Sequence, residues 1–197
     1  MKWNTSSKEF ENFLKFERNL SKNTISSYLA DLKKLRDYLR LKNINYNPNQ
    51  ISTDLIREFL YSQSKKIKSS TQGRLISSLN LFFDFMILEK IIIENPLEKI
   101  DYPKIGTSIP TTLTTKEIDS LIAKAGLNKN NGLRNETIIE ILYSCGLRVS
   151  ELIDLKISDL FLDENLIKVL GKGNKERFVP VSKTAKKLIV EYIESIR

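Results

Sequence analysis

Apolar side chains in the first half of the chain recur every three or four residues, which is the period of an amphipathic helix. In the first such repeat Phe10, Phe13 and Leu14 share one face, with Lys15 and Glu17 on the opposite face. We expect four helices of this kind between residues 5 and 93. They are predicted around Lys8–Arg18, over Lys22–Lys42, from Ser52 or Thr53 through Leu60, and from Ser69-Ser70-Thr71 onward.

The inward stripes of these helices carry most of the large apolar residues of this region. Because the aromatic members fall on those stripes, we interpret them as core residues rather than as platforms for stacked bases. Ser21 is a candidate N-cap for the second helix, and Asn47-Pro48 breaks the chain after it. Residues 1–95 therefore predict a small all-helical domain. The expected core residues of its second and fourth helices are Ile25, Tyr28, Leu32, Leu35, Leu39, Leu75, Leu79, Phe82, Phe83 and Met86.

Proline and glycine interrupt the pattern after residue 95. Pro96, Pro103, Gly106 and Pro110 lie close together, and Ser and Thr fill much of 107–115. Since proline stops helices and favours extended chain, we expect residues 96–112 to be an interdomain linker.

The remaining residues, 113–197, predict a second domain that mixes helices with a small hairpin. Four helices are expected, namely Lys116–Ala125 after Thr114 or Thr115, a buried helix Leu133–Cys145 after the polar loop Asn128–Gly132, a short helix capped by Ser150 and ending at Leu155, and Lys183–Arg197 capped by Ser182. Between the last two, the period shortens to that of strands, over Leu166–Leu170 and Arg177–Val181 around the turn Gly171–Lys175. The predicted fold class is mainly α with a small β-hairpin or sheet (α+β).

The net charge favours a polyanionic partner, and nucleic acid before membrane. The formal charge is +8, and residues 1–95 carry 16 Lys and Arg against 10 Asp and Glu, whereas residues 96–197 carry 16 against 14. The helical domain is therefore the expected electrostatic contact with such a partner. An alternative is that a lysine-rich, AT-biased genome produces the same composition.

The cysteine content and the apolar runs indicate a soluble cytoplasmic protein without a membrane partner. Cys145 is the only cysteine, so no internal disulfide can form, and its apolar neighbours favour a buried, inert thiol over a reactive one. The longest apolar run, Met86–Ile93, is interrupted by Glu89 and Lys90, and no run reaches the ~18 residues of a membrane span.

Arg148 is the first candidate for phosphate chemistry. Gly146 permits an abrupt change of direction, so the turn rather than a helix aims the side chain that follows. An arginine held there offers a planar fork of donors to two phosphate oxygens, and Glu151 is a candidate to hold the guanidinium in place. The alternative is an ordinary Arg–Glu pair on a helix surface, which contributes little.

Lys172 is the second candidate, between Gly171 and Gly173 in the hairpin turn. A lysine there can contact DNA or donate a proton to a leaving alkoxide, and Lys175 and Arg177 add charge nearby. The alternative is a solvated, charged turn. The spacing of a phosphate-cradling P-loop is absent.

Taken together, GLRVSEL (146–152) and GKGNKERFVPV (171–181) resemble the tyrosine recombinase (phage-integrase-type) family, and its bacterial Xer branch in particular. LKFERNLSKNTISSYLADLKKLRDYL (14–39) resembles the opening of the family's SAM-like four-helix core-binding domain. ENPLEKIDYPK (94–104) and IPTTLTTKEID (109–119) resemble the linker into the catalytic domain. The resemblance thus covers the whole chain.

The resemblance implies site-specific DNA strand exchange, as in chromosome dimer resolution. Arg148 matches the arginine that clamps the scissile phosphate, Lys172 the lysine that protonates the 5′-oxygen leaving group, and Glu151 a position that supports the arginine. In the family a tyrosine attacks the phosphate and forms a 3′-phosphotyrosyl link, which needs neither metal nor cofactor. The implied shape is a C-shaped clamp around duplex DNA, with further recombinase protomers as partners.

The chain departs from the family pattern in its later motifs. The sequence contains no histidine, so a His-x-x-Arg box is missing, and no segment resembles that of the nucleophilic tyrosine. Tyr192 and Tyr143 fall at helical spacings typical of packing residues, and we reject both as nucleophiles. We therefore expect a C-terminally truncated recombinase that binds DNA but does not cleave it alone.

Three interpretations stay open: an N-terminal portion of a recombinase, a DNA-binding product that interferes with an intact partner, and a decayed gene product. Exposed apolar patches within 133–197 would favour the first or the third. Residues from the second and fourth helices and from the hairpin are candidates for contact with DNA, without assignment to bases or backbone. They are Lys22, Asn23, Thr24, Ser27, Tyr28, Lys33, Lys68, Ser70, Thr71, Arg74, Lys175 and Arg177.

Overall fold

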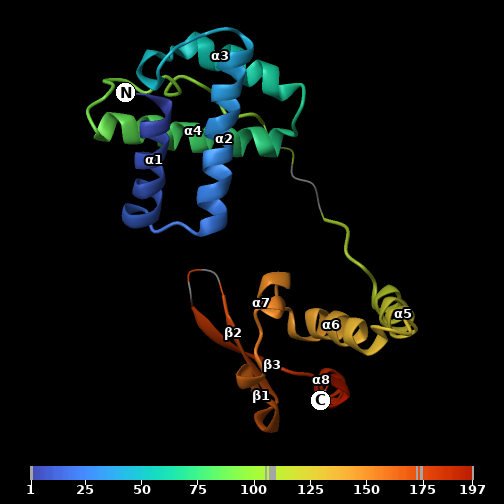
Figure 1. The fold of residues 1–197 in the computed structure, drawn as a ribbon. Coiled ribbons are helices and arrows are strands. Elements are labelled where there is room, and N and C mark those ends of the chain that lie inside the picture. Colours follow the sequence, from blue (N-terminus) through green and yellow to red (C-terminus); the bar gives the residue numbers. More distant parts are fainter. Residues whose placement is uncertain (1, 105, 107–109, 172, 174, 197) are drawn as a thin grey trace. The chain divides into compact units, whose positions relative to one another are not determined.

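The chain forms two compact units, Met1–Ser108 and Ile109–Arg197, each of which is considered by itself (Figure 1). The structure is a computed structural model that describes residues 2–104, 106, 110–171, 173 and 175–196. It is mainly helical with one small antiparallel sheet, which confirms the predicted fold class.

The four predicted helices of the first unit are all present. They are α1 (Trp3–Asn12), which continues as the π-helical turn Phe13–Glu17, α2 (Lys22–Leu41), α3 (Thr53–Ser64) and α4 (Ser69–Leu88); a 3-10 turn, Pro48–Gln50, precedes α3. Ser21 caps α2 by accepting a hydrogen bond from the backbone N–H of Thr24 at 3.3 Å, and Ser52 does the same for Leu55 at 3.3 Å.

The first helix begins at Trp3 rather than near Lys8, so its predicted start was wrong. The indole Nε1 of Trp3 donates a hydrogen bond to the carbonyl oxygen of Tyr46 at 2.8 Å, and the Trp3 ring stacks on Phe82 at 6.2 Å between ring centroids. Helix length at this end is therefore set by contacts with distant residues, which local periodicity does not report.

The core of the first unit is closed and rich in aromatic residues. Phe10, Phe59 and Phe82 have no exposed surface, and Leu35 and Met86 are equally buried. The aromatic residues of the stripes are thus core residues, as predicted, although Tyr28 is only partly buried. The same core includes Leu97, so the first unit extends past residue 95 into the segment expected to be linker.

In the second unit, α6 (Gly132–Cys145) lies beside both α5 (Thr115–Gly126) and α8 (Lys183–Ile196) (Figure 1). A small sheet completes this unit. The strands β1 (Leu160–Phe161), β2 (Leu166–Leu170) and β3 (Glu176–Pro180) follow that order and pair antiparallel. In the hairpin Val169 lies opposite Arg177, and Ile167 opposite Val179. Short helical turns, α7 (Val149–Ile153) and the 3-10 turns Ile157–Asp159 and Leu162–Glu164, connect these elements.

The starts of α5 and α8 agree with the predicted capping residues. Thr114 and Glu117 form a reciprocal capping box at the start of α5, in which Glu117 accepts from the Thr114 backbone N–H at 2.7 Å. The hydroxyl of Ser182 accepts from the backbone N–H of Ala185 at 3.0 Å at the start of α8.

The second unit departs from prediction at three places. Ser150 does not cap α7, because the cap position is Arg148 and Ser150 is already inside the helix, which ends at Ile153 instead of Leu155. Helix α6 is only partly buried: Tyr143, expected to be a core residue, is 49% exposed. Strand β1 was not predicted, since two residues are too few to display a period.

None of the helices over residues 2–104 and 110–196 is both long enough and apolar enough to cross a membrane. In the described part of the chain, no three His, Cys, Asp or Glu side chains gather as they would around a metal ion.

Candidate active site

Arg148 is positioned by the abrupt end of α6. Gly146 adopts a left-handed backbone with φ of +60°, which terminates the helix, as the glycine predicts. Leu147 is buried in the core of the second unit and anchors the chain there. Arg148 follows in an extended conformation at the N-cap of α7. Its side chain is 67% exposed, so the guanidinium stands at the surface on a backbone that the core holds.

Glu151 is the centre of the site. Its side chain is 3% exposed and accepts four hydrogen bonds from two arginines. Arg148 contributes its backbone N–H to Oε2 and its Nη1 to Oε1, both at 2.8 Å. Arg177, on β3, contributes Nη1 to Oε1 at 2.7 Å and Nη2 to Oε2 at 2.9 Å. The predicted support of Arg148 by Glu151 is thus present as geometry, with a second arginine added.

These contacts lower the pKa of the Glu151 carboxyl to about 2. The hydrogen bonds from Arg177 are the largest cause, followed by the hydrogen bond from the backbone N–H of Arg148, while burial acts in the opposite direction. In return, Glu151 raises the pKa of the Arg177 guanidinium. The carboxylate is therefore ionised throughout the neutral range, and the Arg177 guanidinium remains charged.

The β2–β3 turn lies against this cluster. The backbone N–H of Gly171 donates to the carbonyl of Lys175 at 2.8 Å and closes the base of the turn. A Cβ atom at Gly171 would lie 3.0 Å from Nη1 of Arg177 and 3.6 Å from Oε1 of Glu151, so the turn backbone packs directly on the ion pair. Lys172 lies outside the described residues, and Lys175 is exposed.

The arrangement can present a cation to an anionic ligand. The buried Glu151 carboxylate accepts a hydrogen bond from Nη1 of Arg148. The other guanidinium nitrogens of Arg148 have no partner in the described part of the chain. A fork of donors of this kind matches two oxygens of one phosphate. The alternative of a weak surface pair does not fit, because Glu151 is buried and shared by two arginines.

A second buried carboxylate, Asp31, lies in the first unit. Asp31 has no exposed surface and joins α2 to α4 through both oxygens. Arg74 donates to Oδ2 through Nη1 and to Oδ1 through Nη2 at 3.1 Å, and Ser78 donates to Oδ2 at 3.0 Å. Lys34 adds a 2.9 Å ion pair to Oδ1. Arg74, a candidate for DNA contact, is thus held by a carboxylate within its own unit.

The other candidate DNA contacts of the first unit lie near the starts of α2 and α4, except for Lys33 in the middle of α2. Thr24 has its hydroxyl 2.9 Å from that of Ser21 at the cap of α2, and Ser27 and Tyr28 lie one turn before Asp31. Ser70 and Thr71 lie one turn before Arg74. The Asp31–Arg74 pair therefore links the two helices close to both groups. Exposed lysines and an asparagine complete the set, namely Lys22, Asn23, Lys33 and Lys68.

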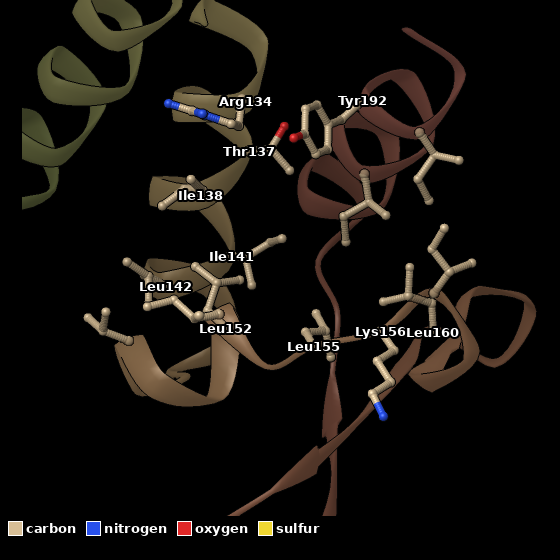
Figure 2. A pocket seen from close by; sticks show the side chains of 15 residues that line it. Arg134, Thr137, Ile138, Ile141, Leu142, Leu152, Leu155, Lys156, Leu160 and Tyr192 are labelled. Atoms are coloured by element: carbon tan, nitrogen blue, oxygen red, sulfur yellow. The ribbon is translucent and has the colours of Figure 1, made fainter. Parts of the chain in front are cut away.

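An open apolar groove of about 460 Å³ lies between α6, α7 and α8 (Figure 2). Ile138 and Ile141 line it from α6, and Tyr192 reaches it from α8 beside Thr137. The α7 end is the most exposed, with Ile153 75% exposed. Exposed apolar surface in this part of the chain is the feature that was expected to favour an incomplete or a decayed recombinase.

The remaining candidates have structural surroundings. Tyr192 is half-buried and lines the groove, in agreement with its interpretation as a packing residue. Cys145 is 7% exposed within the core of the second unit, which confirms the buried thiol.

Sequence reasoning missed that Arg74 and Arg177 hold buried carboxylates. For Arg177 the signal was available, because Arg177 and Val179 alternate on the strand face that carries the core residues. For Arg74 there was none, since its partner Asp31 lies 43 positions away in the chain.

Two family profiles together match most of the chain. The sequence profile described as "Phage integrase family" matches residues 111–196. The profile described as "Phage integrase, N-terminal SAM-like domain" matches residues 8–90.

Curated relatives named tyrosine recombinase XerD match nearly the whole chain. The protein from Staphylococcus epidermidis is 37% identical over 198 residues, which cover 98% of this chain and 66% of the relative. The protein from Staphylococcus aureus strain Mu50 is 38% identical over 192 residues, which cover 96% of this chain and 64% of the relative. The chain thus spans slightly less than two thirds of the length of these relatives.

Solved structures share the fold. A lambda integrase dimer bound to a COC′ core site matches with a TM-score of 0.75 at 20% identity, covering 97% of this chain and 54% of that one. XerH recombinase in a post-cleavage complex with palindromic difH substrate matches with a TM-score of 0.67 at 23% identity, covering 95% and 57%.

Proposed function

The chain belongs to the tyrosine recombinase (phage integrase) family, and on that premise we propose that it binds duplex DNA and holds a phosphate for site-specific strand exchange. The observation that carries the proposal is the exposed guanidinium of Arg148, supported by the buried Glu151 carboxylate. A cation fixed before the substrate arrives can stabilise charge that develops on a phosphate without rearrangement at that moment.

Arg148 clamps the scissile phosphate in this proposal, and Lys172 protonates the 5′-oxygen as it leaves. In strand exchange of this type a tyrosine forms a 3′-phosphotyrosyl link, and a 5′-hydroxyl from another strand then resolves it. The energy of the broken phosphodiester is kept in the covalent link, so the reaction uses no metal and no nucleotide.

The first unit supplies a large part of the electrostatic contact with DNA. Its residues up to 95 carry 16 Lys and Arg against 10 Asp and Glu, and the candidate contacts near the starts of α2 and α4 are exposed or partly exposed. Lambda integrase and XerH, which share the fold, were solved on DNA, and this supports a duplex as the partner here. We further propose that the protein forms a clamp around the duplex and assembles with further recombinase protomers. We also propose that it acts in the cytoplasm.

These 197 residues bind without cleaving when they act alone. They contain no histidine, and so no His-x-x-Arg box, and Tyr192 lines an apolar groove instead of the phosphate site at Arg148. The open apolar groove supports a protein in which further residues or another molecule cover this surface. It argues against a self-contained DNA-binding module.

Binding is tested by gel shifts with a short palindromic duplex at several salt concentrations. We expect affinity to fall steeply with salt, with a slope of log K against log salt of roughly −0.9 for each phosphate neutralised. An absent shift, or one that salt does not change, contradicts DNA binding.

Cleavage is tested with a nicked duplex that traps the covalent intermediate. The expected result is no covalent adduct on a denaturing gel. An adduct would overturn the proposal that this chain does not cleave alone, while leaving DNA binding intact.

A further inference from the structure

We propose that Arg177 is a positioning residue of the phosphate site: through Glu151 it fixes Arg148 and the base of the β2–β3 turn relative to one another. This inference rests on the proposed function, because the phosphate site gives the positioning its purpose. In this inference Arg177 positions Glu151 and Arg148 and does not itself contact DNA.

The hydrogen bonds of Arg177 support this role. Both of its terminal nitrogens donate to Glu151, one to each oxygen, at 2.7 and 2.9 Å. Two parallel bonds of this kind fix the plane of the carboxylate as well as its position. The same two oxygens receive Nη1 and the backbone N–H of Arg148, so the orientation of the carboxylate determines where Arg148 is held.

The strand register explains how Arg177 reaches this place. Arg177 lies opposite Val169, which is 2% exposed, and alternates with Val179 on the face that packs toward the core. The Glu151 carboxylate on α7 is 3% exposed and needs a partner of opposite charge, which Arg177 supplies from the inward face of β3. The pair thus joins the sheet to the helical turn that carries Arg148.

The close approach of Gly171 extends the arrangement to the turn. With only 3.0 Å between a Cβ at this position and Nη1 of Arg177, the backbone of residue 171 rests on the ion pair. Lys172 is the next residue in the chain. One arginine is therefore in contact with the element before Lys172 and, through one carboxylate, with Arg148.

The first test needs no DNA. Hydrogen exchange of the Arg148 guanidinium with water is measured by NMR in the full chain, in Arg177→Ala and in a control, Lys175→Ala, which removes the neighbouring exposed cation. We expect exchange to accelerate roughly tenfold in Arg177→Ala, since a charge-assisted hydrogen bond is weakened, and to stay unchanged in the control.

Melting curves of each variant accompany the exchange measurement. If Arg177→Ala does not fold, Arg177→Gln, which keeps most of the side-chain length, gives the same readout. Unchanged exchange of Arg148 in the folded variant overturns the inference, because Glu151 would then hold Arg148 unaided.

The second test is a double-mutant cycle on duplex affinity with Arg148→Ala, Arg177→Ala and the double variant. If Arg177 acts only through Arg148, the double variant binds no more than about twofold more weakly than Arg148→Ala. A loss equal to the product of the two single losses contradicts the inference, because Arg177 would then act on duplex binding independently of Arg148. If the unaltered chain binds no duplex, the proposed function fails, while the exchange measurement still decides the role of Arg177.

Discussion

The two units differ in how completely they cover their apolar residues. In the first unit Ile56 and Phe59 have no exposed surface, and twenty buried apolar side chains form one core among the described residues. In the second unit the corresponding cluster holds eight, and Ile153 and Ile157 are 75% and 61% exposed. Since apolar burial is the main source of folding free energy, we expect the first unit to have the larger free energy of unfolding.

The two buried carboxylates show the same difference on a smaller scale. Asp31 joins two helices of a closed core, and its charged partners, Arg74 and Lys34, are each 40% exposed. Glu151 holds Arg177, which is 39% exposed, and Arg148, which is 67% exposed. The first carboxylate thus contributes mainly to packing, whereas the second presents a cation to the surface.

Truncating one isoleucine in each unit gives the largest expected contrast. Ile56→Ala should lower the free energy of unfolding of the first unit by about 2–5 kcal/mol, because it leaves a cavity in a closed core. Trp3 is the only tryptophan and packs on that core, so its fluorescence during urea unfolding reports on the first unit.

The matched control is Ile153→Ala, which should change stability by less than about 0.5 kcal/mol. Circular dichroism follows this variant. Equal losses in the two variants would remove the distinction between a closed and an open core.

Asp31→Asn should have the next largest effect. The amide cannot hold Arg74, Lys34 and Ser78 as the carboxylate does, and we expect a loss of about 2 kcal/mol in the unfolding of the first unit. Asp54→Asn makes the same change at an exposed ion pair with Arg57 and should cost no more than about 0.5 kcal/mol. A similar small loss at both positions would show that Asp31 does not join the helices energetically.

Glu151→Gln should reveal a pH-dependent contribution to the stability of the second unit. The pKa of Glu151 is about 2 in the folded chain and roughly 4.3 when unfolded, so the unfolded state binds more protons between these values. The stabilisation is present above the unfolded pKa and is lost as pH falls toward 2.

Urea unfolding of the original chain and of Glu151→Gln between pH 7 and pH 2 measures this contribution. The difference in stability should be constant above about pH 5 and should shrink at lower pH. A difference that does not vary with pH would argue against an ionised, hydrogen-bonded Glu151.

Ile153→Lys should have the smallest effect on stability and a clear effect on the surface. The side chain is already 75% exposed, so we expect a change within about 0.5 kcal/mol. Binding of a dye such as ANS, which reports exposed apolar surface, should decrease. Unchanged dye binding would show that the groove beside α7 is not the accessible apolar surface.

Much of the fold could be predicted because its signals are local. The stripes around Phe10 and Leu35, the cap at Ser21 and the helix end at Gly146 each involve residues within a few positions of one another. Arg148 and Glu151 lie three residues apart, so their pairing was also predictable.

The features that escaped prediction depend on distant partners. Trp3 extends α1 through the carbonyl of Tyr46, and Arg74 finds Asp31 across 43 positions. Arg177 reaches Glu151 across 26 positions, although its place on the inward strand face was visible in the alternation. The local hydrophobic period determines which face of a helix or strand a residue occupies, whereas tertiary packing determines which residues it contacts on that face.

The central claim is that Arg148 faces a DNA phosphate. The most direct measurement is the salt dependence of duplex binding by the unaltered chain, by Arg148→Ala and by Arg134→Ala, which removes an exposed arginine at the apolar groove of the same unit. We predict that Arg148→Ala reduces the magnitude of the slope of log K against log salt by about 1, with the slope of Arg134→Ala unchanged. Equal slopes for all three proteins would contradict it.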